Sequence, residues 1–395
     1  MCATRIVHNA LTQTKPNAKH TIIWQEWDTF GVTDANVAAI KALKPETAYI
    51  LDLGSGLDVL EKAMALLKSG INVVIWDNHP PDPKVESAED YNIYKASVEN
   101  LKVTPEGDAT FVYESSNENC TTGIAYKWAK LLGWPIANME KWALLGLRGD
   151  VASDSDEGGP IYNEILTRHG GLKGLLATEA NLGYNWGLID FYAQLLHVQR
   201  RMVFNAAPPF CYEGMKEMEQ IPNWLELYTL ITKGSLASPL FEGGKNPNTQ
   251  MMAMNHIKYK PEFKKVSEDW KNNVKLEFSY NDRGIGKTYG VSVISHEWNI
   301  GSAMANKLGG QNKKPWFVIN TIPKYGIHVS GRNGTENPAH DPTESSIHIG
   351  KVFRSANPAI MEGGGLKQAG SAKTHSNNPE AVLDELVRAV EASMS

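Results

Sequence analysis

The first 165 residues alternate short apolar runs with amphipathic stretches, which is the pattern of strands followed by helices. The clearest unit covers residues 48–82, where an apolar run ends at Asp52, a helical stretch follows, and a second apolar run ends at Asp77. Residues 20–25 and 110–114 read as further strands. Strands that alternate with helices predict a parallel α/β sheet.

Apolar residues recur at helical spacing between these strands. We expect helices at residues 3–14, 35–43 and 122–132, and Thr121 is placed to cap the last of them. Residues 80–108 are rich in proline and charge and predict a loop with a short helix.

The rest of the chain changes character twice. From residue 161 to about 270 the pattern is helical and aromatic, and then strand and helix patterns return. We expect strands at 289–295, 316–320 and 326–330, a helix at 302–308, and a last helix at 379–394. The prediction is therefore an α/β protein with three parts: a parallel-sheet domain (1–165), a helical connector (166–280) and a smaller C-terminal α/β domain (281–395).

Polar side chains follow two strands of the predicted sheet. Asp52 closes the first strand, and Asp77, Asn78 and His79 close the second, while Asp150 follows a later apolar run. Because parallel strands end at the same sheet edge, we expect these groups to share one crevice. Carboxylate and imidazole ligands suit Mn²⁺ or Mg²⁺, and two such ions can activate water against a phosphate ester. Each residue taken alone is more often a helix cap or a turn residue.

The C-terminal part offers two candidates for holding an anion. The glycines Gly363, Gly364 and Gly365 precede Lys367, and glycine lets backbone N–H groups approach a phosphate. Ser330 and Arg332 close a predicted strand, where an arginine can grip phosphate with two hydrogen bonds. The alternatives are a flexible turn and a surface arginine.

Composition narrows the class of protein. Hydrophobic residues make up 42% and charged residues 21%, as in an ordinary globular protein. The net charge of −5 argues against a strongly basic nucleic-acid coat but not against a local basic groove. The three cysteines are far apart, which is typical of a reducing cytosol. We see no apolar run of membrane length and no signal peptide, and we expect a cytoplasmic protein with no membrane partner.

Two other motifs suggest functions different from a metal site. Residues 284–288 end like a phosphate-binding P-loop, but Asn281 stands where that loop needs a glycine and a strand pattern follows. Residues 50–77 are similar to the cofactor loop of S-adenosylmethionine-dependent methyltransferases, with Asp77 as the ribose ligand. Asp58 stands at that family's third glycine.

Taken in order, these motifs resemble the DHH phosphoesterase superfamily, with its C-terminal DHH-associated domain and RecJ-type exonucleases. The resemblance rests on Asp52, Asp77-Asn78-His79, Gly149-Asp150, Ser330-Gly331-Arg332 and the 363–370 stretch. It implies catalytic Asp52, Asp77, His79 and Asp150, metal ligands Asp52, Asn78, His79 and Asp150, and two Mn²⁺ or Mg²⁺ ions if the full chain carries the family's first motif. The substrate would be held by Ser330, Arg332, Gly363, Gly364, Gly365 and Lys367. The active site would lie in the cleft between the lobes.

The chain departs from this family in three ways. The Asp-x-Asp of the first motif has no match, and Cys2-Ala3-Thr4-Arg5 is similar to the segment after that motif, so we expect the two aspartates just before Met1 if the chain is cut. Asn78 replaces a ligating histidine, which should weaken metal binding. Leu366 stands where the glycine stretch usually ends in histidine.

Three functions are consistent with these observations. The first is a metal-dependent phosphodiesterase, a RecJ-like exonuclease or oligonucleotide hydrolase acting on single-stranded DNA, RNA or short oligonucleotides. The second is a catalytically weak or inactive DHH-family scaffold that works with replication or repair proteins. The third is the methyltransferase.

Overall fold

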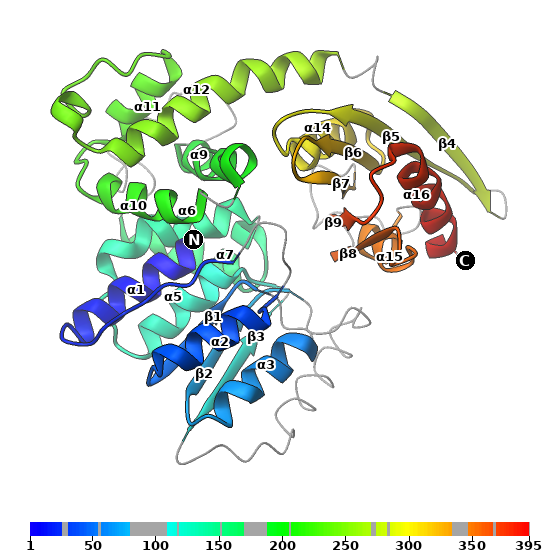
Figure 1. Cartoon of the computed structure of the whole chain (residues 1–395). Coiled ribbons are helices and arrows are strands. Elements are labelled where there is room, and N and C mark those ends of the chain that lie inside the picture. Colours follow the sequence, from blue (N-terminus) through cyan, green and yellow to red (C-terminus); the bar gives the residue numbers. More distant parts are fainter. Residues whose placement is uncertain are drawn as a thin grey trace. The chain divides into compact units, whose positions relative to one another are not determined.

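The computed structural model describes residues 1–25, 31–53, 57–79, 109–116, 118–150, 152–169, 188–204, 207–269, 274–282, 285–333, 347–365 and 369–394. The chain forms two compact units (Figure 1). The first comprises Met1–Arg200 and Phe204–Ile257, and the second comprises Arg201–Val203 and Lys258–Ser395. The three-part division drawn from the sequence stays a prediction, and the loop and short helix expected at 80–108 lie outside the described residues.

The first unit is built on a parallel sheet. Strands β1 (Thr47–Leu51), β2 (Asn72–Asp77) and β3 (Phe111–Ser115) pair in that order, with Leu51 opposite Trp76 and Asp77 opposite Ser115. The two strands predicted to end at Asp52 and Asp77 and the strand predicted at 110–114 are confirmed to within one residue at their ends. Because the strands are parallel, their carboxyl ends meet at one edge.

Helices cover both faces of this sheet, because apolar side chains alternate between its faces. On one face Ile50, Val73 and Ile75 pack with α2 (Asp34–Leu43) and α3 (Leu57–Leu67). On the other face Trp76 packs with α1 (Cys2–Thr14) and α5 (Thr121–Leu131). The helices expected at 3–14, 35–43 and 122–132 are confirmed.

The prediction of a strand at residues 20–25 is wrong. The segment takes neither helix nor strand conformation, although it lies on the wall of the same pocket as β1. A strand needs a neighbour to bond with, and within the described part of the chain β1 pairs only with β2. The apolar pattern alone carries no information about which strands pair.

Further helices complete the first unit. Three of them contribute aromatic side chains to the core, where the Trp224 ring contacts the rings of Trp142 and Tyr192. The helices are α6 (Glu140–Gly149), α7 (Gly158–Arg168), α9 (Leu188–Val203), α10 (Ala207–Glu219), α11 (Trp224–Thr232) and α12 (Pro247–Glu268), with the short 3₁₀ turns Ala137–Met139, Ala152–Asp154 and Glu242–Gly244. The last residues of α9 and the second half of α12 belong to the second unit.

The second unit is a mixed six-stranded sheet in the order β4-β5-β6-β7-β9-β8. Among these described strands the β5–β6 pair is parallel, and the other pairs are antiparallel. The strands are β4 (Val274–Asp282), β5 (Ile285–Ser295), β6 (Trp316–Ile322), β7 (Gly326–Arg332), β8 (Met361–Gly365) and β9 (Ala369–Thr374). Residues 285–288 belong to strand β5, so they do not open a helix as a P-loop would.

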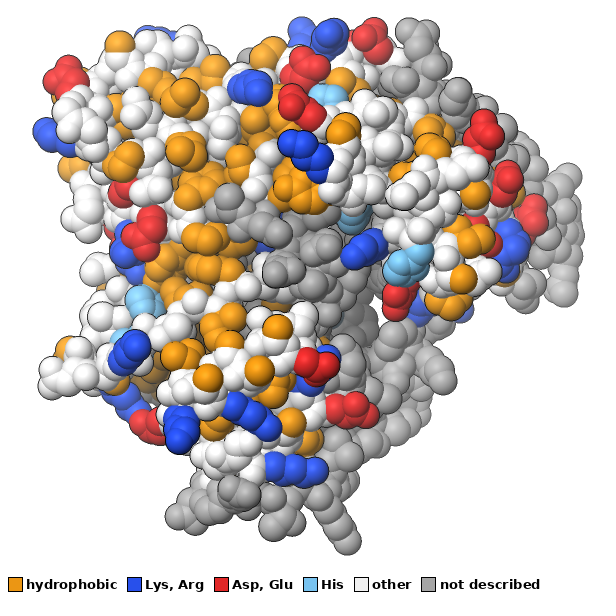
Figure 2. All heavy atoms as spheres, viewed as in Figure 1, with side chains coloured by type: hydrophobic (Ala, Val, Ile, Leu, Met, Phe, Trp, Pro, Cys, Tyr) orange, Lys and Arg blue, Asp and Glu red, His pale blue; other side chains and the backbone are white. Residues whose placement is uncertain are grey.

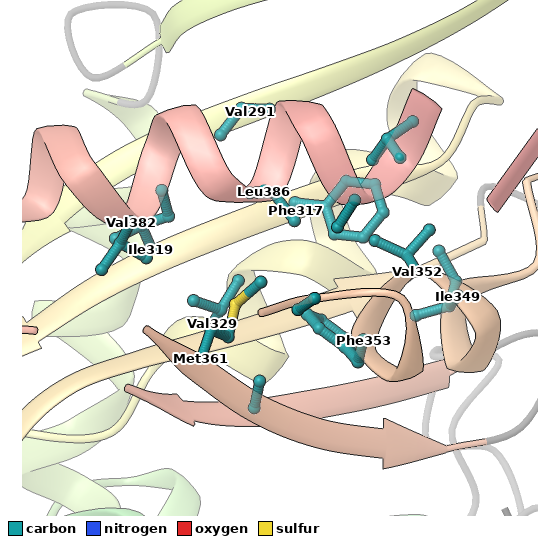
Figure 3. Packing of buried hydrophobic residues seen from close by; sticks show 14 of the residues in the cluster. Val291, Phe317, Ile319, Val329, Ile349, Val352, Phe353, Met361, Val382 and Leu386 are labelled. Carbon is teal, nitrogen blue, oxygen red and sulfur yellow. The ribbon is translucent and has the colours of Figure 1, made fainter. Parts of the chain in front are cut away.

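The core of the second unit lies between this sheet and two helices, α15 (Ile349–Arg354) and α16 (Pro379–Met394). Figure 3 shows Phe317 and Val329 of the sheet packing against Phe353 and Leu386 of these helices. Helix α14 (Gly301–Asn312) packs on β6 and β7. The structure therefore confirms the α/β class, with a parallel sheet in the N-terminal unit and a separate C-terminal α/β unit.

Candidate metal centre

The carboxyl ends of β1 and β2 bring the two central aspartates together. Asp52 directly follows β1 in the left-handed region (φ 60°), and its N–H donates to the carbonyl of Trp76 at 3.2 Å. Asp77 is the last residue of β2 and is fully buried. Parallel pairing thus places both carboxyl groups at one sheet edge, as the sequence predicts.

His79 is fixed against the carboxylate of Asp77. Its backbone N–H donates to Asp77 Oδ1 at 2.6 Å, and its Nδ1 lies 2.8 Å from the same oxygen. The Nδ1 is 4.0 Å from Asp52 Oδ1. Ser115, at the end of β3, donates its hydroxyl to the carbonyl of His79 at 3.1 Å. The tight turn after β2 therefore aims the imidazole at both aspartates.

Asp52, Asp77 and His79 form a group that could hold a metal ion. One ligand atom from each lies within 4.8 Å of the others. Asp77 is closed off from solvent, whereas 48% of the Asp52 side chain and 54% of the His79 side chain are exposed. Two carboxylates and an imidazole are the ligands that Mn²⁺ and Mg²⁺ accept.

Asn78 and Asp150 complete the cluster. The Asn78 Nδ2 donates to Asp150 Oδ2 at 3.5 Å, and Asp150 directly follows α6. The structure therefore brings together all five residues that the sequence singled out in this domain. Their roles as ligands or catalysts stay predictions.

Thr121 is a site residue that sequence reasoning missed. Its hydroxyl lies 3.1 Å from Asp52 Oδ1 and 2.9 Å from Asn78 Oδ1. The prediction that Thr121 caps α5 is wrong, because the cap is Cys120, whose sulfur accepts from the Gly123 N–H at 3.4 Å. The Cys-Thr-Thr sequence offers three side chains that can cap a helix, and sequence alone does not say which of them turns towards the sheet edge.

The electrostatics of the cluster show an excess of negative charge. Burial and the nearby Asp77 carboxylate raise the pKa of Asp52, although His79 opposes them. Burial and the charge of Asp52 raise the pKa of Asp150 to about 6. Burial lowers the pKa of His79, but the hydrogen bond with Asp77 and the three carboxylates outweigh it and raise the pKa to about 10. A divalent cation here would relieve the mutual repulsion of the carboxylates.

A pocket of about 1010 Å³ opens beside the cluster within the first unit. Asp52 and Asp150 lie on its wall together with Cys2 of α1 and with His197 and Arg200 of α9. Burial lowers the pKa of Arg200, while the charge of Asp52 acts in the opposite direction. Sequence reasoning missed His197 and Arg200 because they lie in the helical stretch that was interpreted as a connector.

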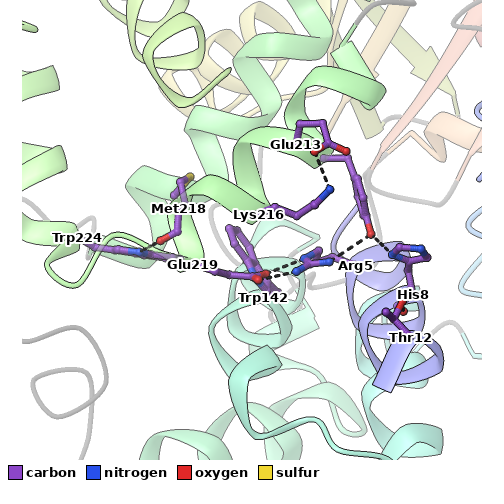
Figure 4. Close-up of polar contacts among 10 residues, drawn as sticks. Arg5, His8, Thr12, Trp142, Glu213, Lys216, Met218, Glu219 and Trp224 are labelled. Atoms are coloured by element: carbon purple, nitrogen blue, oxygen red, sulfur yellow. Dashed lines mark hydrogen bonds and ion pairs between the residues drawn. The ribbon is translucent and has the colours of Figure 1, made fainter. Parts of the chain in front are cut away.

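Helix α1 is held in place at this pocket by a buried ion pair (Figure 4). Arg5 Nη2 lies 2.5 Å from Glu219 Oε2 on α10, and Arg5 Nε donates to Glu219 Oε1 at 2.7 Å. Trp142 Nε1 donates to the same Oε1 at 2.7 Å. Arg5 also donates to the hydroxyl of Tyr212, which contacts His8 Nδ1. These bonds fix the start of α1, where Cys2 lines the pocket.

The predicted substrate-binding residues lie in the second unit, and their side chains are largely engaged there. Arg332 donates to the carbonyls of Gly331 and Gly370 and to the Ser302 hydroxyl, at 2.8, 3.2 and 2.5 Å. Burial and the charge of Arg201 lower its pKa to about 10. Ser330 is buried in β7. Arg332 is half-buried and its guanidinium is bonded within the unit, so it is not a fully exposed surface arginine. Its role in substrate binding stays a prediction.

The triple glycine forms strand β8 and not a turn. Gly363, Gly364 and Gly365 pair with β9, and a Cβ on Gly363 would lie 2.3 Å from the carbonyl oxygen of Ser371. Gly365 has φ 141°, and a Cβ on it would lie 2.4 Å from the carbonyl oxygen of Ala369. Close packing explains Gly363 and Gly365. Lys367 and Leu366 lie outside the described residues, and anion binding here stays a prediction.

Comparison with solved structures identifies the fold. The DHH domain of a protein described as a member of a family of ribosomal proteins aligns with 100% of this chain and 83% of its own, at a TM-score of 0.58 and 13% identity. RecJ from Thermus thermophilus in complex with Mn²⁺ aligns with 99% of this chain and 49% of its own, at a TM-score of 0.55 and 15% identity. The sequence matches no protein-family model and no curated protein.

The chain therefore shares its fold with RecJ and with this DHH domain. The resemblance drawn from the sequence is confirmed at the level of the fold. No helix in the described part of the chain combines the length and the apolar character that crossing a membrane requires.

Proposed function

We propose that the chain is a metal-dependent phosphoesterase of the DHH type, a RecJ-like exonuclease or oligonucleotide hydrolase acting on single-stranded DNA or RNA. The observation that carries the proposal is the group of Asp52, Asp77 and His79, whose ligand atoms lie within 4.8 Å of one another at the sheet edge. The shared fold and the Mn²⁺ complex of RecJ support it.

The residues fit a divalent cation, Mn²⁺ or Mg²⁺. Asp52, Asp77 and His79 would hold it, and the excess of carboxylate charge in the cluster favours it. When bound, the ion would lower the pKa of water and polarise a phosphoryl oxygen. Asp77 orients the His79 imidazole through its 2.8 Å contact, and Thr121 orients the Asp52 carboxylate.

Asp150 and Arg200 are suited to the substrate side of this centre. Burial and Asp52 keep the pKa of Asp150 at about 6, so it can exchange a proton with water close to neutral pH. Arg200 lies on the same pocket wall and can neutralise a phosphate. On the face shown in Figure 2, the described basic and acidic side chains are interspersed, so this face carries no broad basic coat among the described residues.

One experiment tests the proposal directly. The purified full-length chain is incubated with 5′- and 3′-labelled single-stranded DNA and RNA, with and without Mn²⁺, and compared with Asp52→Asn. Mn²⁺-dependent hydrolysis that EDTA abolishes and that Asp52→Asn lacks supports the enzyme. A folded chain that binds Mn²⁺ but hydrolyses none of the substrates would contradict it.

Asn78 specifically favours the second function, a catalytically weak scaffold acting with replication or repair proteins. It stands where the resemblance places a ligating histidine, and its amide is engaged with Asp150 and Thr121. Absence of hydrolysis together with capture of single-stranded nucleic acid without Mn²⁺ would support this function. The methyltransferase interpretation is disfavoured, because Asp77 is fully buried against His79 and does not present its carboxylate to a ribose.

A further inference from the structure

The side chain of Asn78 has a defined orientation. Its Nδ2 donates to the carboxylate oxygen of Asp150 at 3.5 Å, and its Oδ1 accepts from the Thr121 hydroxyl at 2.9 Å. Turning the amide by 180° would place Oδ1 against the Asp150 carboxylate, and two oxygens with partial or full negative charge repel each other. Electrostatics therefore selects the orientation in which the NH₂ group faces Asp150.

Thr121 extends this contact to the other side of the cluster. The same hydroxyl lies 3.1 Å from Asp52 Oδ1. A threonine hydroxyl has one hydrogen, so it is shared between two acceptors, Asp52 and Asn78. One continuous row of polar contacts thus crosses the sheet edge and consists of Asp52, Thr121, Asn78 and Asp150.

The acidic residues of the cluster fall into two kinds, those that lie with His79 and the one that faces Asn78. Asp52 and Asp77 join His79 in the group whose ligand atoms lie within 4.8 Å of one another, and Asp150 is not part of that group among the described residues. Asp150 instead faces the NH₂ group of Asn78. An amide nitrogen has no lone pair available for a metal. The NH₂ group of Asn78 therefore offers Asp150 a hydrogen-bond donor and offers a second cation no ligand.

We propose that Asn78 is a positioning residue that holds Asp150 by its NH₂ group, and that the centre takes a single divalent cation at Asp52, Asp77 and His79. The proposal rests on the proposed metal-dependent function and deepens it. The family resemblance implies two ions if the full chain carries the first motif, whereas the present proposal concerns the ligand that Asn78 does not supply in the chain as given.

Counting bound Mn²⁺ tests this inference. The full chain and its variants are titrated with Mn²⁺, and free Mn²⁺ is followed by electron paramagnetic resonance with isothermal calorimetry in parallel. We expect one ion per wild-type chain. Asn78→His and Asn78→Asp each add a ligand beside Asp150, so we expect two ions, with a spin-coupled signal if the ions lie about 3.5–4 Å apart.

Asn163→His is the matched control, because Asn163 is exposed on α7. It adds a surface histidine and should leave the count at one. Asn78→Asp changes the size of the side chain least, so it serves if Asn78→His fails to fold, as judged by circular dichroism. Two ions in the wild type, or one ion in folded Asn78→His and Asn78→Asp, would overturn the proposal.

The outcomes also separate this inference from the proposed function. If no Mn²⁺ binds to the wild type, the metal centre itself is wrong and both fail. If one ion binds but no phosphodiester is hydrolysed, the enzyme proposal fails while the single-ion centre stands. If two ions bind and hydrolysis occurs, only the present inference is wrong.

Discussion

Arg5 and Glu219 lie at opposite ends of the first unit's sequence, and their side chains form a two-pronged ion pair, with Arg5 Nη2 2.5 Å from Glu219 Oε2. Only 9% of the Arg5 side chain and 18% of the Glu219 side chain are exposed. Since water screens this pair little, removing one partner leaves a charge without compensation in a buried place.

Glu219→Gln should therefore lower the free energy of unfolding by about 3 kcal/mol, as urea titration followed by tryptophan fluorescence would measure. Glu46→Gln is the control, because the Lys15–Glu46 pair has a similar length of 3.0 Å but is 53% and 73% exposed. Its loss should cost less than about 1 kcal/mol. Equal losses in both variants would show that the Arg5 pair does not anchor α1.

Asp52→Asn should reduce Mn²⁺-dependent hydrolysis by about 100-fold or more, equivalent to about 2.7 kcal/mol of lost transition-state stabilisation. Asparagine keeps the size of the side chain and tolerates the left-handed backbone at this position. The measurement is the hydrolysis rate at saturating Mn²⁺, together with circular dichroism. Unchanged activity and metal content in a folded variant would show that the site is elsewhere.

Arg200→Gln should weaken the binding of a phosphate-bearing substrate by about tenfold, or about 1.4 kcal/mol. Arg200 lines the pocket together with Asp52 and Asp150, and we expect no metal-ligand role for it. KM for a single-stranded oligonucleotide should rise while the Mn²⁺ count stays the same. Lys127→Gln is a control, because Lys127 is paired with Glu114 and does not line the pocket.

The stability that Glu385 contributes to the second unit should be lost in acid. Its carboxylate, which is 6% exposed, pairs with Arg388 and accepts from the Asn357 N–H at 2.5 Å. The hydrogen bond with Arg388 is the main cause that lowers the pKa of Glu385 below 4.5. A lowered carboxyl pKa stabilises the fold above about pH 4.5, and this contribution is lost as pH falls through the lower folded value.

Glu385→Gln should therefore lose about 1–3 kcal/mol at pH 7 and show less further loss between pH 5 and pH 3 than the wild type. Urea unfolding across that range measures both effects. Glu391→Gln, an exposed position on the same helix, should follow the wild-type pH profile. Parallel pH profiles for wild type and Glu385→Gln would contradict the assignment.

Sequence reasoning located the strand ends but not the residues that packing brings to them. Asp52 and Asp77 could be predicted because apolar runs, a helix between them and the geometry of parallel strands place both at one edge. Thr121 could not, because a threonine at a helix start usually caps the helix, and only the structure shows Cys120 in that role. His197 and Arg200 reach the pocket through helix packing over a long sequence separation, for which local periodicity carries no signal.

The same limit applies to the second unit. Its strands were recognisable from alternating apolar residues, but Gly363–Gly365 suggested a loop because strands are usually poor in glycine. The structure shows that Gly363 is needed where β8 approaches β9 closely. Arg332 was predicted at the correct strand end, yet its contacts with Gly370 and Ser302 depend on elements distant in the sequence.

Two requirements meet at Asp52, which are a left-handed backbone conformation and the negative charge of the proposed metal site. A β-branched or bulky residue would strain the chain at φ 60°, and glycine or asparagine would relax it without supplying a negative charge. Aspartate alone among the twenty residues combines a carboxylate this short with tolerance of that conformation. Replacement by asparagine or glycine at this position should therefore keep the fold while removing the negative charge that the proposed metal site needs.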